Sequence, residues 1–452
     1  MVKRRDFIKK AGIGAATFLG SEVLGAPFIN RKRPDKRPPN ILLILTDQQR
    51  FDTIAAQRKT GMYTPNLDRL AAEGVRFDRA YCAQALCSPS RASIISGLYP
   101  HTHKVQENIY GIDDTLSMPD YNLGATWPLL LQQAGYRTCW IGKWHLGEKA
   151  PKCFDEWYGF NSLLSHWMGK YEKSEYRSDK ETDIGLDFLE RNKHRPFVLC
   201  QSYYPPHTPY TAPEEFVKLY VGKTQFRPAK YYAAISNIDM NVGRLLRKLE
   251  DLGLIHNTVV IFTSDHGEHF GQRPGGANKR GAYDDCARIP LIARYPGMFE
   301  GGLVKPHLVS NVDIMPTILD IAAVNIPSHV QGRSLRQLGT GKTSAWRSAV
   351  CIENLEATST SENSNTCNSR GIRTNIRKLI LRDRLSVRAE CLRELYDSIG
   401  DPFEKNNIYG HSELSRIRTI LHYLENWARE TDDDVGTRLA RECRTDLGIV
   451  ES

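Results

Sequence analysis

The sequence predicts an α/β fold in which a large, mostly parallel β-sheet is covered by helices on both faces. Short apolar runs with the length of buried strands recur along the chain, and stretches with helical spacing lie between them. From about residue 346 the sequence changes to a polar loop followed by shorter patterned segments. This change predicts a smaller C-terminal α+β domain that contains a short antiparallel sheet.

Five apolar runs are predicted as strands of the large sheet. Between the third and fourth runs, residues 231–253 carry apolar side chains at helical intervals, and Gly253 is typical of a helix end. In the C-terminal part we expect antiparallel strands from residue 371 onward and a helix around residues 412–430. The five predicted strands are NILLILT (40–46), TCWIGK (138–143), PFVLCQS (196–202), TVVIFTS (258–264) and IPLIARY (289–295).

The length and charge of the chain limit its organisation and its partners. With 452 residues, 40% of them hydrophobic, it can bury one large core and a smaller one. We expect a leader and linker at residues 1–37, a main domain at 38–345 and a smaller domain at 346–452. The formal charge is +9, but residues 1–37 contain ten Lys or Arg and three Asp or Glu, so the rest carries only +2. A nucleic-acid partner is therefore not expected.

The N-terminal segment has the features of an export signal. A basic head precedes a short apolar run and a small-residue cleavage site near Gly25-Ala26, and the run is too short and glycine-rich for a stable membrane span. The stretch from Arg4 to Lys9 resembles the bacterial twin-arginine signal, which a translocase reads on folded proteins. A basic helix start is the alternative. Export predicts a periplasmic or secreted protein.

Ten cysteines are compatible with an oxidising compartment. Cys351 and Cys367 flank a polar loop that a disulfide could close, and two free thiols are the alternative. The pairing of the others does not follow from spacing.

Polar side chains follow four of the predicted strands. In open α/β sheets, ligands bind outside the carboxyl ends of the strands, so these side chains are expected to converge on one site. Each of them alone is compatible with a capping or loop role, whereas their joint occurrence indicates a site. They are Asp47, Lys143, His145, His207, Asp265 and His266.

A fifth element of the predicted site is the stretch Cys87-Ser88-Pro89-Ser90-Arg91. By itself it is compatible with ordinary chemistry at a helix N-terminus. A second pattern, Gly135-Tyr136-x-Thr138-x-x-x-Gly142-Lys143-x-His145, lies further along the chain. Together with ILLILTDQ before them and FTSDHGE after them, the two patterns resemble the signatures of the sulfatases of the alkaline phosphatase superfamily. The resemblance covers about residues 40–295 and extends more weakly to ELYDSIGDPFEKNN.

This resemblance implies a chemical role for Cys87. In the family, the cysteine of Cys-x-Pro-x-Arg is oxidised by a maturation enzyme to formylglycine (3-oxoalanine), an aldehyde that hydrates to a geminal diol. Pro89 and Arg91 would belong to the maturation signal. Conversion acts on an unfolded chain and would precede export of the folded protein.

Elementary chemistry explains why a sulfate ester needs such a site. The ester is an anion that repels anionic nucleophiles, and its alkoxide leaving group is poor, so a cation, an activated hydroxyl and an acid are needed. One diol hydroxyl of modified Cys87 would attack sulfur and take up the sulfate group. The second hydroxyl would then expel sulfate by elimination and regenerate the aldehyde.

The resemblance also implies one divalent cation, held by Asp47, Asp265 and modified Cys87, with Gln48 and His266 completing the site. The sequence departs here from a common family pattern, because it has Asp47-Gln48 and Asp265-His266 where many members have Asp-Asp and Asp-Asn. An amide lowers the negative charge of the site, and an imidazole favours softer ions. Calcium is expected first, with magnesium or manganese as alternatives.

Three residues of the two signatures are expected to handle charge and protons. Arg91 and Lys143 would hold the diol and the sulfate oxygens. His145 would accept the proton that drives elimination.

The leaving oxygen would be served by His207, in the family-like pattern Pro-His-x-Pro, together with Lys279. The alignment of Lys279 is looser, because Arg280 lies beside it and a surface lysine is the alternative. His101 and His103 do not have zinc-site spacing. Asn108, His269 and Arg273 are candidates for the substrate mouth or ordinary loop residues.

The predicted function is therefore hydrolysis of sulfate esters, with sulfated small molecules or sulfated polysaccharides as substrates. Two alternatives stay open. One is a phosphomonoester or phosphonate ester hydrolase on the same scaffold, because a similar pocket fits other tetrahedral anions. The other is a non-catalytic protein that binds sulfated glycans.

Overall fold

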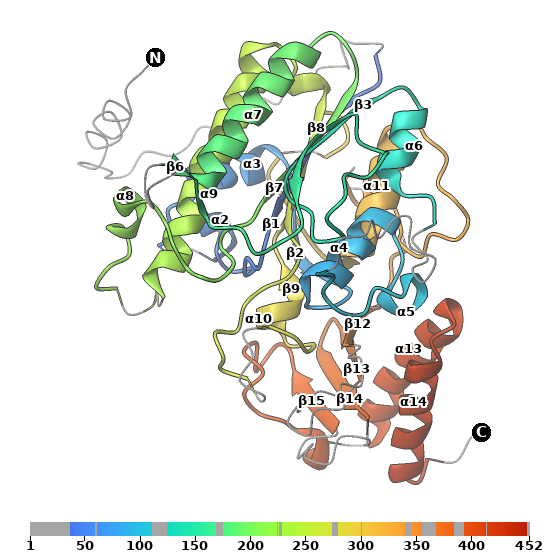
Figure 1. The fold of residues 1–452 in the computed structure, drawn as a ribbon. Coiled ribbons are helices and arrows are strands. Elements are labelled where there is room, and N and C mark those ends of the chain that lie inside the picture. The colour runs from blue at the N-terminus through green and yellow to red at the C-terminus, as the bar shows by residue number, and fades with distance from the viewer. Residues whose placement is uncertain are drawn as a thin grey trace.

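The structure is a computed structural model that describes residues 37–58, 61–110, 124–168, 175–223, 225, 228–273, 279–299, 301–339, 345–354, 368–383, 393–412 and 414–449. The predicted export signal and Cys367 lie outside these residues. Within them the chain forms a large sheet between two layers of helices and, at one end, a smaller C-terminal unit (Figure 1). The predicted α/β architecture is confirmed.

The centre of the large sheet is parallel. β1 (Asn40–Thr46) lies between β7 (Phe197–Tyr203) and β8 (Thr258–Ser264), and all three run in the same direction. Beyond β7 the sheet continues in parallel with β3 (Arg137–Lys143) and β4 (Glu156–Phe160). The four predicted strands in this half match the observed ones to within one residue at each end.

The other half of the sheet is mixed. The predicted run at residues 289–295 forms two short strands, because Pro290 has no N–H to continue the ladder. The strands of this half are β2 (Val75–Tyr81), β9 (Arg288–Ile289), β10 (Leu291–Arg294) and β11 (Leu303–Ser310). β10 pairs antiparallel with both β8 and β2, β9 pairs antiparallel with β2, and β11 pairs parallel with β2.

Helices cover both faces of the sheet, as the continuous apolar strands predict. Leu42 and Ile44 of β1 pack in the core on one face, whereas Leu43 and Leu45 pack in the core on the other. The first face carries α3 (Pro65–Glu73), α7 (Arg177–Asn192) and α9 (Ala229–Asp251); the second carries α4 (Cys87–Ser96), α6 (Trp127–Gln133) and α11 (Ile314–Ile321) (Figure 1). Shorter elements are α2 (Ala55–Arg58), α5 (Pro100–His103), α8 (Glu214–Val217), α10 (Asp284–Ala287), α12 (Arg336–Gly339), β5 (Trp167–Met168), β6 (Glu175–Tyr176) and the 3-10 turns η2 (Ile255–Asn257), η3 (Asn311–Asp313) and η4 (Tyr409–His411).

The C-terminal unit is a four-stranded antiparallel sheet packed against two helices (Figure 1). Its helices are α13 (Leu414–Thr431), close to the predicted helix, and α14 (Asp434–Asp446), which the sequence did not predict. Asp433 begins α14 by accepting a hydrogen bond from the Gly436 N–H, and Leu439 and Cys443 are among its buried side chains. Its strands are β12 (Ala349–Asn354), β13 (Ser369–Thr374), β14 (Arg377–Arg382) and β15 (Arg393–Asp397).

Buried ionic groups join the C-terminal unit to the large sheet. The ammonium group of Lys378, on β14, donates to the Ala282 carbonyl at 2.7 Å and pairs with Asp284 and Glu404. Lys378 is fully buried, so its charge depends on these partners. The unit therefore contacts the segment that follows Lys279.

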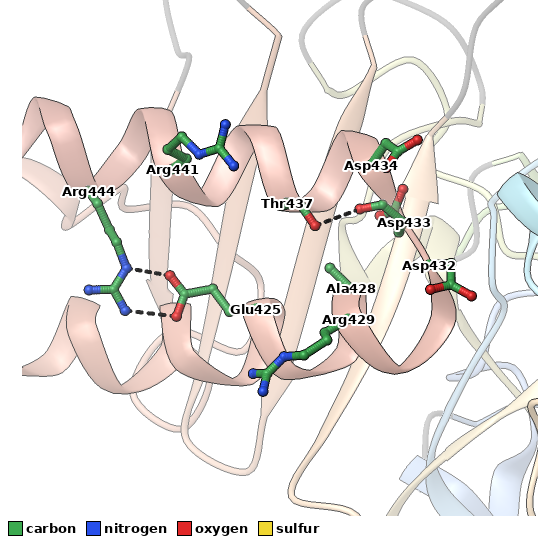
Figure 2. Close-up of a pocket in the computed structure, with 9 residues that line it drawn as sticks. All are labelled: Glu425, Ala428, Arg429, Asp432, Asp433, Asp434, Thr437, Arg441 and Arg444. Atoms are coloured by element: carbon green, nitrogen blue, oxygen red, sulfur yellow. Dashed lines mark hydrogen bonds and ion pairs between the residues drawn. The ribbon is translucent and has the colours of Figure 1, made fainter. Parts of the chain in front are cut away.

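A cavity of about 620 Å³ lies between α13 and α14 (Figure 2). Arg444 and Glu425 face each other across it as an ion pair. None of the predicted site residues lines it; its lining residues are Glu425, Ala428, Arg429, Asp432, Asp433, Asp434, Thr437, Arg441 and Arg444. Among the described residues, no helix has both the length and the hydrophobicity of a membrane-spanning segment.

Candidate active site

The predicted site residues meet at the carboxyl ends of the central strands. Asp47 follows β1, Lys143 ends β3, and Asp265 follows β8, so the parallel order of the strands places all three at one edge. Cys87 is the first residue of α4 and brings the fourth group to this edge. Each of these side chains is buried, so their charges interact in an environment with little water.

The sulfur of Cys87 lies among charged groups of both signs. It is 3.0 Å from Lys279 Nζ, 3.6 Å from Lys143 Nζ, 3.2 Å from His266 Nε2 and 3.7 Å from an Asp47 carboxylate oxygen. Burial alone would raise the pKa of this thiol, but Lys143, Lys279 and His266 outweigh burial and hold the pKa well below its ordinary value. Position 87 is therefore built to hold an anionic group.

Helix α4 is buried along its whole length and holds Arg91 one turn beyond Cys87. The guanidinium group donates to Asp265 at 2.8 Å and to Asp47 at 3.1 Å, and its third contact is the Lys143 carbonyl at 2.7 Å. Arg91 thus cross-links three strand ends. The left-handed Gly97 (φ 68°) ends the helix, where its N–H donates to the Ser93 carbonyl.

The pKa values of the two carboxylates are shifted in opposite directions. Burial would raise both pKa values, but Lys143, His207 and Arg91 hold the pKa of Asp47 well below the ordinary range. The pKa of Asp265 is raised, first by burial and then by the charge of Asp47. Two buried carboxylates placed this close together form a site that a cation would stabilise.

The ligand atoms at this edge fit a divalent cation. One atom each from Asp47, Cys87, Asp265 and His266 lies within 4.8 Å of the others, and all four residues are buried. The Nδ1 atom of His266 lies 2.8 Å from the Gly267 carbonyl, which directs Nε2 toward Cys87. Asp265 and Cys87 outweigh the effect of burial and raise the pKa of His266, so cation binding would displace a proton from Nε2.

Gln48 joins the site through its side-chain oxygen. Oε1 lies 3.1 Å from Lys279 Nζ, and the backbone N–H donates to Asp265 at 3.0 Å. On its other side, the Gln48 amide nitrogen contacts the carboxylate of Glu268. The structure therefore places Gln48 beside the four-residue cluster, with its oxygen directed toward Lys279.

Lys143 is held at the end of β3 by a tight backbone contact. Gly142 has φ 92°, and a Cβ atom at this position would lie 1.9 Å from the Ser202 carbonyl oxygen, so the strand accepts only glycine here. The Lys143 ammonium group pairs with Asp47 and lies 4.6 Å from the centre of the Tyr204 ring.

His145 is buried, and its imidazole interacts with the side chain of Cys87. Burial and the neighbouring charge of Lys143 lower its pKa to about 4. The imidazole is therefore neutral near pH 7 and can accept a proton.

His207 and Lys279 form a second pair at the outer side of the cluster. Lys279 Nζ lies 3.1 Å from His207 Nε2, and His207 Nδ1 lies 2.6 Å from the Thr208 carbonyl oxygen. Burial would lower the pKa of Lys279, but Cys87 and Asp47 raise it above the ordinary value. Lys279 is thus a site lysine with a stable charge, whereas its neighbour Arg280 pairs with Glu107.

Other residues considered from the sequence have structural contacts. His101 lies 2.7 Å from Glu353 of β12, and His103 lies 3.0 Å from Ser93, so both pack around α4. Arg273 pairs with Asp285 and donates to two carbonyls of the C-terminal unit. Asn108 accepts from the Ser88 N–H at 3.1 Å, beside Cys87. His269 is buried, with Nδ1 unpaired among the described residues.

Sequence reasoning missed three side chains that support the site. Ser202, at the end of β7, lies 3.0 Å from Arg91 and donates to the Lys143 carbonyl at 2.6 Å. The ring of Tyr204 packs against the Lys143 ammonium group, and the carboxylate of Glu268 contacts the Gln48 amide. Glu268 could have been found from its place two residues after His266, and Ser202 from its position at a strand end.

The fold and the site define an α/β protein with a buried cluster of acidic and basic side chains at the carboxyl ends of its central strands. The model of the sulfatase family matches residues 39–324, and a second model, that of the C-terminal region of N-sulphoglucosamine sulphohydrolase, matches residues 273–430. The chain belongs to the sulfatase family, whose members hydrolyse sulfate esters, and this confirms the predicted membership.

Named relatives and solved structures are similar over most of the chain. The N-acetylglucosamine-6-O-sulfatase of Bacteroides thetaiotaomicron is 29% identical over 90% of this chain and 89% of its own. The N-acetylgalactosamine-6-sulfatase of Canis lupus familiaris is 32% identical over 71% of this chain and 66% of its own. A protein solved in complex with its substrate D-glucosamine-2-N,6-O-disulfate superposes with a TM-score of 0.73 and 27% identity over 89% of this chain and 99% of its own. The phosphonate monoester hydrolase of Agrobacterium radiobacter shares the fold, with a TM-score of 0.70 and 22% identity over 86% of this chain and 94% of its own.

Proposed function

We propose that this protein removes sulfate from sulfated carbohydrates by means of a formylglycine formed from Cys87 and one divalent cation. The observation that carries the proposal is the position of the Cys87 sulfur, which shares one buried cluster with Asp47, Asp265 and His266. The names of two similar sulfatases and the substrate of a third protein, all amino sugars, support the substrate class.

The residues around the cluster suit the steps that such hydrolysis requires. When bound, the cation would supply positive charge that favours an ionised hydroxyl on oxidised Cys87 and screens the sulfate group. Arg91 holds both ligand carboxylates in place. Lys143 and Lys279 lie within 3.6 Å and 3.0 Å of the Cys87 sulfur, so their ammonium groups can bind oxygens of a sulfate group placed there.

Proton transfer is assigned to His145 and to the pair formed by His207 and Lys279. His145, neutral near pH 7, accepts a proton from the modified side chain. Lys279 Nζ lies 3.1 Å from His207 Nε2 and can only donate, so His207 orients the ammonium group, which supplies the proton to the leaving oxygen and keeps that side of the site positive.

A ligand set of two carboxylates and one imidazole is compatible with more than one divalent cation, so the identity of the cation is a question for experiment. Calcium is the first choice because carboxylate oxygens dominate, and magnesium and manganese are the alternatives. A maturation enzyme and the twin-arginine translocase are proposed as partners, with the periplasm or the exterior as the location. These proposals rest on the sequence of residues 1–37 and 87–91.

The test uses the full chain produced together with a formylglycine-generating enzyme. We expect mass spectrometry to find aldehyde in place of the Cys87 thiol. The protein should then release sulfate from N-acetylglucosamine 6-sulfate and from 4-nitrophenyl sulfate, and a chelator should stop both reactions. Cys87→Ala should fold and show no turnover. A folded Cys87→Ala variant with appreciable activity would contradict the proposal.

The same experiment separates the rival functions. Faster cleavage of 4-nitrophenyl phosphate or of a phosphonate monoester than of either sulfate would favour the phosphoryl hydrolase that the shared fold allows. An unmodified Cys87 with tight glycan binding and no turnover would favour the non-catalytic binder.

A further inference from the structure

The carboxamide of Gln48 lies between two groups of opposite hydrogen-bonding character. Lys279 Nζ lies 3.1 Å from Oε1, and an ammonium group can only donate. The carboxylate of Glu268 contacts Nε2, and an ionised carboxylate can only accept. The oxygen of the amide must therefore face Lys279, and its NH2 group must face Glu268.

Glu268 itself is fully buried and held in place by further donors. The hydroxyl of Tyr210 donates to its Oε2 at 2.6 Å, and the backbone N–H of Phe270 donates to its Oε1 at 2.6 Å. With the Gln48 amide, the carboxylate has three donors, which satisfies a buried charge and restricts its rotation. Glu268 is thus held in a fixed position next to the Gln48 amide group.

We propose that Glu268 is a positioning residue that keeps the oxygen of Gln48, and not its NH2 group, directed at the cation site and at Lys279. The inference rests on the proposed function, because it assumes that a divalent cation binds among Asp47, Asp265 and His266. If Glu268 lost its charge, the amide could turn over and present NH2 to an ammonium group and a cation. Glu268 therefore acts through Gln48 and does not contact the reacting atoms.

The first experiment measures cation affinity directly. Full-length, matured protein is stripped of metal and titrated with Ca²⁺ by calorimetry, and separately with Mn²⁺. We expect Glu268→Gln, which keeps the shape and removes the charge, to weaken the Kd by about 10- to 100-fold. Glu394→Gln is the matched control: this glutamate on β15 is also buried, but it accepts hydrogen bonds from Tyr283 and Tyr396, away from the cluster, so the Kd of this variant should equal that of the unsubstituted protein.

A double-mutant cycle tests whether Glu268 works through Gln48. In a Gln48→Ala background, Glu268→Gln should change neither the Kd nor the ratio of kcat to KM for 4-nitrophenyl sulfate. Excess Ca²⁺ should restore most of the activity of Glu268→Gln alone. Glu268→Asp keeps the charge on a shorter side chain, so its Kd should lie between those of the unsubstituted protein and of Glu268→Gln. This variant serves in place of Glu268→Gln if the latter does not fold.

Two results would overturn the inference. One is an unchanged Kd in a folded Glu268→Gln protein, and the other is an effect of that substitution that is fully additive with Gln48→Ala. Either result leaves the proposed function intact if the unsubstituted protein binds the cation and cleaves sulfate. Absence of cation binding in the unsubstituted, matured protein would instead refute the proposed function.

Discussion

Lys279 Nζ lies 3.0 Å from the sulfur of Cys87, although the two residues are 192 positions apart in the chain. Lys143 approaches the same sulfur from β3 at 3.6 Å. Two ammonium groups converging on one thiol in a buried site stabilise its anionic form by direct attraction.

Unmodified Cys87 is therefore expected to ionise at unusually low pH. In metal-free protein made without a maturation enzyme, ultraviolet thiolate absorbance should rise well below the ordinary pKa of cysteine. Lys279→Met removes one of the cations that lower this pKa, so the thiolate transition should move to higher pH. Burial raises the pKa values of Cys82, Cys200 and Cys286, so these thiols should not interfere.

Lys152→Met is the control for this titration, because Lys152 is exposed. An identical thiolate transition in the Lys279→Met and Lys152→Met proteins would mean that Lys279 does not contact Cys87 in solution.

The pH profile of sulfate release should report on His145. Burial and Lys143 lower its pKa to about 4, so the imidazole remains a base until the pH falls through that value. In a plot of kcat/KM against pH, activity should therefore be lost on the acidic side, at a pH well below the ordinary pKa range of histidine. His145→Ala should lower kcat by about 10²- to 10⁴-fold.

His411→Ala, on an exposed turn, is the matched histidine control and should behave as the unsubstituted protein. The assignment fails if the acidic limb is centred near pH 6.5 or if His145→Ala leaves kcat unchanged.

Much of the site could be predicted because it lies at strand ends. Asp47, Lys143 and Asp265 follow apolar runs of strand length, and parallel pairing brings such ends together without further information. β2 and β11 were missed because their sequences, VRFDRAY and LVKPHLVS, mix charged and apolar residues at partly exposed positions. α14 was missed because most of its residues are polar and only one face is buried.

Long-range pairings were beyond the reach of sequence patterns. The contact between Gln48 and Glu268 depends on how two loops pack after β1 and β8. Arg273, considered for the substrate mouth, instead donates to carbonyls of Phe403 and Glu404 at the C-terminal unit. Such partners are set by the docking of distant segments, and spacing along the chain does not encode them.

Gly142 is expected to tolerate no side chain. Its φ of 92° already disfavours alanine, and the added Cβ would lie 1.9 Å from the Ser202 carbonyl, so β3 would have to move away from β7. Gly142→Ala should therefore lower both stability and activity, because Lys143 follows directly. Gly135 has a similar φ of 87° with no atom within 4 Å of the added Cβ, and Gly135→Ala should cost only about 1–2 kcal/mol.

Thermal and urea unfolding of the two alanine variants would measure this difference. Equal losses of stability would show that backbone strain alone, and not the clash with Ser202, makes glycine necessary at position 142.

The buried ion cluster at the C-terminal unit should make stability depend on Lys378. Its ammonium group lies 2.5 Å from both Asp284 and Glu404. Lys378→Met would leave these buried carboxylates only their more distant arginine partners, at 3.5 Å or more. Removal of one partner from a buried pair costs about 3–5 kcal/mol. Because Lys378 also holds the Ala282 carbonyl, the substitution should displace Lys279 and lower kcat in the protein that remains folded.

The loss of stability in Lys378→Met should depend on pH with a definite sign. Burial raises the pKa of Glu404 from 4.5 to about 7 against the opposing effect of Lys378, so the folded state binds its proton more tightly than the unfolded state does. The stabilising contribution of that proton is present below about pH 4.5 and is lost as the pH rises through about 7. Without Lys378, the free energy of unfolding should depend more strongly on pH. Measured by urea unfolding, the loss of stability in Lys378→Met relative to the unsubstituted protein should therefore be larger at about pH 8 than at about pH 5. Lys218→Met, at an exposed position, should show no deficit at either pH, and a pH-independent loss in Lys378→Met would contradict the role of Glu404.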